Sequence, residues 1–183
     1  MKNHTLFALA FIAASAFHTP NAASASYAGQ EERAIKALSA EEVRSLRDGK
    51  GMGFAKAAEL NSYPGPSHVL QLAEQLQLSA SQKEQTAALF KAMEAKARKL
   101  GNELVEAERE LDQLFASRSA TAPLLETQLA KIGNLQAQVR GTHLAAHIAQ
   151  AAILKPEQIA QYDKLRGYHN KPQHDSNHAG HQH

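Results

Sequence analysis

The residues of this 183-residue chain with the clearest capacity for chemistry are its ten histidines, because it contains no cysteine. His143 and His147 are four positions apart in a stretch with helical apolar spacing. Such a pair places two imidazoles on one helical face, where they can bind a zinc ion, or alternatively copper, nickel or cobalt. A third ligand, His68, would join them if the first and last parts of the fold lie side by side. The alternative is that these histidines are partly buried or surface residues that bind no ion.

Five further histidines are interspersed among Asn, Gln, Asp, Ser and Gly near the carboxyl end: His169, His174, His178, His181 and His183. A segment of this composition cannot bury enough apolar surface to fold, yet its imidazoles can gather around an ion. Because their spacing is irregular, we expect an adjustable, disordered metal-collecting tail over residues 169–183 and no fixed site. The alternative is a solvated tail without a ligand.

The same sequence argues against catalysis. Leu144 directly follows His143, where a metalloprotease of the H-E-x-x-H type needs its Glu general base. No Ser-His-Asp arrangement or Gly-x-Ser-x-Gly elbow stands out. The alternating glycines of residues 48–53 lack the preceding strand and the following Gly-Lys-Ser/Thr of a phosphate-binding loop, so we interpret them as a flexible elbow. We therefore predict that the protein is not an enzyme.

The amino-terminal residues indicate export. Lys2 precedes an apolar run over residues 6–17, which is too short for a membrane span of roughly 20 residues. Residues 1–25 are therefore interpreted as a signal peptide cleaved after Ala25, with an uncleaved anchor as the alternative, and the location as the periplasm. No other segment would insert stably into a membrane. The near balance of 20 Lys and Arg against 18 Asp and Glu gives no strong field for nucleic acid.

The elements that must position the histidines are helices, since Ala, Leu, Gln, Glu and Lys dominate and Trp is absent. A helix over residues 80–117 would be about 57 Å long at its rise of about 1.5 Å per residue, so we expect an elongated molecule. A second long helix begins near Pro123 and runs toward Ile153, which makes an antiparallel hairpin. The apolar seam of the first helix has heptad spacing: Phe90, Met93, Ala97, Leu100, Leu104, Ala107, Leu111 and Leu114. The stripe of the second contains Leu125, Leu129, Ile132, Leu135 and Val139.

Short helices are expected on both sides of this hairpin. One begins after the capping box at Ser39, one runs from His68 to Leu78, and one runs from Pro156 to Gly167 with Tyr162 and Leu165 facing inward. We divide the mature chain into an amino-terminal helical extension with a Gly-rich elbow (26–62), a helical domain (63–168) and the His-rich tail. Whether the extension packs on the hairpin stays open.

Two of the predicted helix starts share a motif. Leu78-Ser79-Ala80-Ser81-Gln82 and Leu154-Lys155-Pro156-Glu157-Gln158 resemble the paired LTxxQ motifs of the Spy/CpxP family, which includes zinc resistance-associated and periplasmic heavy-metal-sensor proteins. The order of helices over residues 68–168 is similar too. The motif positions are Leu78, Ser79, Gln82, Leu154, Pro156 and Gln158. Lys155 departs from the usual Thr, and its side chain cannot accept the N-cap hydrogen bond.

The resemblance implies an all-α, cradle-shaped homodimer. It also implies one of two roles: an ATP-independent chaperone that shields unfolding envelope proteins in envelope stress or metal tolerance, or a heavy-metal sensor subunit that restrains a membrane-bound signalling partner. Metal sensors of this family take ligands from the regions of His68 and of the pair His143 and His147, so the resemblance supports grouping these three.

Overall fold

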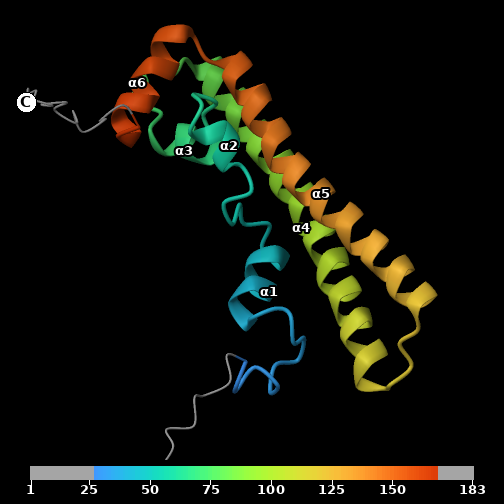
Figure 1. The fold of residues 1–183 in the computed structure, drawn as a ribbon. Coiled ribbons are helices and arrows are strands. Elements are labelled where there is room, and N and C mark those ends of the chain that lie inside the picture. The colour runs from blue at the N-terminus through green and yellow to red at the C-terminus, as the bar shows by residue number, and fades with distance from the viewer. Residues whose placement is uncertain (1–26, 169–183) are drawn as a thin grey trace, which may run out of the picture.

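The computed structural model describes residues 27–168, and this part of the chain is helical, without strands. Figure 1 shows a long helical hairpin with shorter helices along one side and at one end. The predicted all-α, elongated antiparallel hairpin is confirmed. No helix in the described range is both long enough and apolar enough to cross a membrane. Its helices are α1 (Ala40–Arg47), α2 (Lys56–Glu59), α3 (Pro66–Gln71), α4 (Ala80–Ala116), α5 (Ala122–Ile153) and α6 (Pro156–Arg166).

The hairpin of α4 and α5 is held by the seam that the heptad spacing predicted. Leu100 and Leu104 of α4 are buried against Leu135 and Val139 of α5 in one core cluster. Burial of this kind contributes roughly 1.5 to 3 kcal/mol for each large side chain. The predicted stripe is wrong at Leu129, which is 50% exposed, because the core side chains of α5 begin only with Ile132.

The amino-terminal extension packs on the middle of the hairpin through residues 35–46. Ile35 and Leu46 belong to the same core cluster as the seam residues. The contact is close because α4 has Gly101 at this point: a Cβ there would lie 2.0 Å from the carbonyl oxygen of Leu46. Asp112 accepts a hydrogen bond from the backbone of Lys36 at 3.0 Å.

A second core closes the other end of the hairpin. Val69 of α3, Leu78, Leu154 and Tyr162 of α6 are its buried members, together with Leu76. Two predictions are wrong here. Helix α3 ends at Gln71 and is followed by turns, because the chain must reverse before the Ser79 cap, and Gln77 takes a left-handed φ of 50°. Leu165 is 41% exposed, since α6 turns Tyr162 and not Leu165 toward this core.

The two motif glutamines join α4 to α6. The Gln82 side chain caps its own helix by accepting from the Ser79 backbone N–H at 3.1 Å, and Gln158 accepts from Lys155 N–H at 2.9 Å. The two amides also bond to each other reciprocally, at 2.8 and 3.1 Å. Gln82 further donates to Ile153 O, and Gln158 donates to Leu76 O. Each motif therefore caps one helix and fixes the other, which explains why α6 forms with Lys155 at its N-cap.

The predicted signal peptide over residues 1–25 and the predicted tail over residues 169–183 lie outside the described residues. The same is true of the tail ligands His169, His174, His178, His181 and His183. The homodimer stays a prediction.

Candidate metal centre

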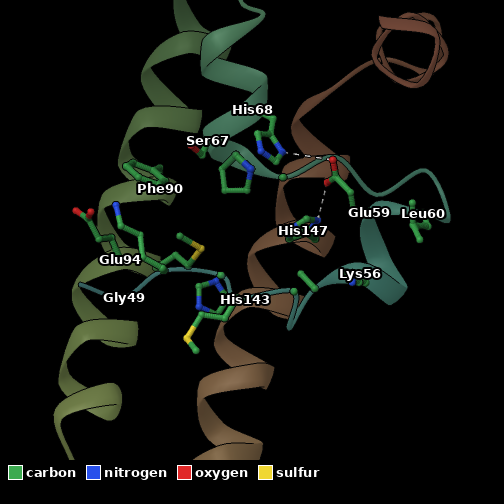
Figure 2. A pocket seen from close by; sticks show the side chains of 18 of the residues that line it. Gly49, Lys56, Glu59, Leu60, Ser67, His68, Phe90, Glu94, His143 and His147 are labelled. Atoms are coloured by element: carbon green, nitrogen blue, oxygen red, sulfur yellow. Dashed lines mark ion pairs between the residues drawn. The ribbon is translucent and has the colours of Figure 1, made fainter. Parts of the chain in front are cut away.

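The structure brings the three predicted ligands of the folded part to one cavity. His68 lies on α3 and the pair His143 and His147 on α5, and all three line a cavity of about 560 Å³ beside the residue 48–53 elbow. Figure 2 shows their rings around this space, with Glu59 of α2 between His68 and His147. His68 was chosen on the expectation that the first and last parts of the fold lie side by side, and its position beside the pair agrees with that expectation.

Glu59 is the central residue that the sequence did not reveal. One carboxylate oxygen, Oε1, accepts hydrogen bonds from the hydroxyls of Tyr162 at 2.5 Å and Tyr168 at 2.7 Å. It also lies 3.3 Å from His68 Nδ1. The other oxygen, Oε2, is buried without a hydrogen-bond partner, 3.6 Å from His147 Nδ1. Burial alone raises the pKa of Glu59, but the two tyrosine hydroxyls, aided by His68 and His147, hold this pKa below its usual value. Glu59 is therefore a carboxylate with one oxygen that accepts no hydrogen bond.

The hydrogen bonds of His68 and His147 determine which nitrogen of each ring is available to bind an ion. His147 Nδ1 lies 2.7 Å from the carbonyl oxygen of Tyr63, which can only accept, so Nδ1 carries the proton. His68 Nδ1 lies 3.3 Å from the hydroxyl oxygen of Tyr162, whose proton is already given to Glu59, so this nitrogen also donates. In the neutral rings, both Nε2 atoms keep their lone pairs. A bonded Nδ1–H with a free Nε2 is the arrangement typical of metal-binding histidines.

Gly65 keeps space between two of these groups. A Cβ at this position would lie 2.9 Å from His147 Cε1, 3.1 Å from His147 Nε2 and 3.4 Å from Glu59 Oε2. Any larger residue would fill the space into which both donor atoms face. The absence of a side chain at Gly65 therefore leaves room for a ligand beside His147.

His143 occupies a different part of the cavity, one turn before His147. Its ring stacks on Phe54 with centroids 6.1 Å apart, and it is only 4% exposed. Its Nε2 is buried without a hydrogen-bond partner. Burial, and secondarily His147, lowers the pKa of His143, so the ring is neutral near pH 7 and can donate a lone pair.

The donor atoms share the cavity without surrounding one point. Across residues 27–168, no three or more His, Asp or Glu side chains are gathered closely enough to hold an ion. The donor set itself fits a borderline divalent ion, since imidazole nitrogens and one carboxylate oxygen are ligands of zinc, nickel and cobalt. Two buried atoms of this set, Glu59 Oε2 and His143 Nε2, have no hydrogen-bond partner in the protein. Binding would require side-chain rotations that bring these atoms together.

Comparison with known proteins agrees with the architecture. A protein-family model described as LTXXQ motif family protein matches residues 66–166. The match covers more than half of the chain and includes both LTxxQ-like motifs. No curated protein and no solved structure matches the chain significantly. The matched signature is that of the Spy/CpxP type, whose members are typically periplasmic and generally non-enzymatic, chaperone-like proteins. Fold, paired motifs and family match together show that the chain belongs to the LTXXQ motif family.

Proposed function

We propose that this protein is a periplasmic metal-binding member of the family, which acts as an ATP-independent chaperone in envelope stress or metal tolerance. The observation that carries the metal part is the cavity lined by Glu59, His68, His143 and His147, with unpartnered donor atoms on Glu59 and His143. Zinc is the ion we propose first, because it accepts nitrogen and carboxylate ligands.

A purely structural role explains this cluster less well. A structural network would use both oxygens of a buried carboxylate, because a buried acceptor without a partner costs about 1 to 3 kcal/mol. Here the tyrosine hydroxyls converge on one oxygen of Glu59, and the other oxygen accepts no hydrogen bond. A bound cation at Oε2 would offset that cost.

The chaperone part is supported by apolar side chains in water. At the hairpin tip, Phe115 of α4 and Leu124 and Leu129 of α5 are about half exposed. Figure 1 places this tip at the opposite end of the hairpin from α6. Exposed apolar surface of this kind can cover the apolar segments of an unfolding client without an energy source.

Titration of zinc into the full chain by calorimetry tests the metal site. The five tail histidines are replaced by Gln throughout, so that only the cavity is measured. We expect Glu59→Gln and His147→Ala to weaken zinc binding by roughly tenfold or more. Loss of a residue that only supports a metal ligand typically lowers metal affinity by about that factor, and loss of the ligand itself should lower it at least as much. Glu126→Gln, an exposed charge on α5, is the matched control. Equal binding by all these variants would refute the site.

A sensor subunit is the second candidate, favoured because the ligands come from separate segments. An ion shared by Glu59 of α2, His68 of α3 and His147 of α5 would change how these segments sit on one another, which is what a signalling partner could detect. Suppression of client aggregation, measured with and without zinc, separates the two roles. A chaperone lowers aggregation, whereas a pure sensor leaves it unchanged.

A further inference from the structure

The cavity also gathers every thioether of the described residues. Met52 from the elbow and Met93 from α4 both line it, together with His143. The only other methionine of the chain is Met1. Within residues 27–168, therefore, all histidines and all methionines line the same cavity. Core packing does not explain this grouping, because neither methionine belongs to the two core clusters.

Met52 is held there in a strained conformation. Its φ of 45° is left-handed, a region that costs roughly 1 to 2 kcal/mol for a residue with a side chain. Its neighbours Gly51 and Gly53 have no such side chain, and a third glycine at position 52 would remove the strain. The Met52 side chain is also 42% exposed, so burial does not repay the strain. Strain of this kind clusters at ligand sites.

His143 supplies the nitrogen that this sulfur pair lacks. Its Nε2 is buried, has no hydrogen-bond partner, and belongs to a ring that faces the cavity between α4 and α5 (Figure 2). Phe54 covers the ring by stacking. The atom is therefore shielded from water and has no hydrogen-bond partner in the protein.

We propose that His143, Met52 and Met93 form a second metal site in the cavity, specific for a soft monovalent cation, Cu(I) or its analogue Ag(I). Thioether sulfur is a soft ligand that prefers Cu(I) over zinc, and one imidazole completes a three-coordinate, uncharged donor set. This site goes beyond the proposed function, since its two thioether ligands and its class of ion differ from those of the group around Glu59, and His143 is the one residue that both groups include. The cavity then discriminates by position: borderline divalent ions at Glu59 and soft monovalent ions at His143.

Methyl NMR of the methionines tests this proposal directly. The full chain, with the five tail histidines replaced by Gln, is labelled with ¹³C at the methionine methyl groups and titrated with Ag(I) in chloride-free buffer. We expect the signals of Met52 and Met93 to shift together and to saturate at one equivalent, while zinc leaves both in place. Signals that stay unshifted by Ag(I), or only one that shifts, would overturn the site.

Affinity measurements with matched variants complete the test. Met52→Leu and Met93→Leu keep volume and apolar character. Each should weaken Ag(I) binding by roughly tenfold or more, on the scale of lost metal interactions, and should leave zinc binding unchanged. Phe90→Leu changes another residue of the cavity wall and should change neither. Conversely, Glu59→Gln should weaken only zinc binding, so the two proposals fail independently. Unchanged Ag(I) affinity in both methionine variants would refute the second site.

Discussion

Replacement of Gln158 by Ala tests the role of the paired motifs in the fold. Its amide is buried and makes four hydrogen bonds: one from Lys155 N–H, one to Leu76 O, and two with Gln82. At about 1 kcal/mol net for each bond, with a discount for Lys155 because it is exposed, the free energy of unfolding should fall by about 3 kcal/mol. That is a large part of the 5 to 15 kcal/mol typical of a domain, yet the protein should stay folded.

A double-mutant cycle isolates the contact between the two glutamines. Gln82→Ala alone should cost a similar amount, since Gln82 also bonds to the Ser79 and Ile153 backbones. The two reciprocal amide bonds are lost in either single variant and counted only once in the double variant. The double variant should therefore be about 2 kcal/mol less destabilised than the sum of the single variants.

Urea unfolding followed by circular dichroism at 222 nm measures these differences. Gln85→Ala is the matched control one turn along α4, because this side chain is exposed and bonds only to Ser81. It should change the free energy of unfolding by less than about 0.5 kcal/mol. If Gln82→Ala and Gln158→Ala are additive, the reciprocal amide pair contributes nothing and our account of the motifs is wrong.

Three further predictions concern single positions. Gly101→Ala should lower the free energy of unfolding by at least about 2 kcal/mol, because its Cβ would lie 2.0 Å from a carbonyl oxygen of α1. Gly133→Ala, where a Cβ meets open space, should raise it by about 0.5 to 1 kcal/mol. Thermal unfolding compares the two variants. Gly65→Ala should weaken zinc binding by roughly tenfold in calorimetry, because it displaces the imidazole that supplies a ligand. Folding lowers the pKa of His143, so below about pH 6.5 the unfolded chain binds a proton at this ring that the folded chain does not bind. The free energy of unfolding should therefore fall as the pH is lowered below about 6.5. In urea unfolding at several pH values, His143→Gln should lose less of this free energy than the unchanged protein.

Sequence reasoning reached the hairpin and the motif helices because their signals are local. Heptad spacing over α4 and the Ser79 capping box depend on residues within a few positions of one another, and Pro156 and Gly167 each mark one end of α6 by themselves. The same reasoning is wrong at Leu129 and Leu165. Both match the helical apolar period, and only the ends of the packed surface decide that they stay exposed.

The candidate site was only partly accessible from the sequence. The pair His143 and His147 is visible as a spacing, and His68 follows from topology. Glu59 is one of many glutamates, and it has no neighbour in the sequence that marks it as a ligand. Its environment is made by two tyrosines more than one hundred positions away. A site built from distant segments leaves no local pattern.

The positions of the anchors determine which part of the molecule an ion could affect. Residues 48–68 carry Met52, Glu59 and His68. The segment is anchored before it begins, where α1 packs on α4 at Gly101, and again within it, where Ser62 donates a hydrogen bond to Asp163 of α6 at 2.6 Å. The buried seam of the long helices consists of their own residues and of Ile35 and Leu46, and residues 48–68 add only the partly buried Phe54 to it. Ligands that draw this segment toward α5 would therefore change the surface of residues 48–68 and leave the hairpin unchanged. A metal signal would be read at this surface, and the hairpin tip would keep its exposed apolar side chains with or without the ion.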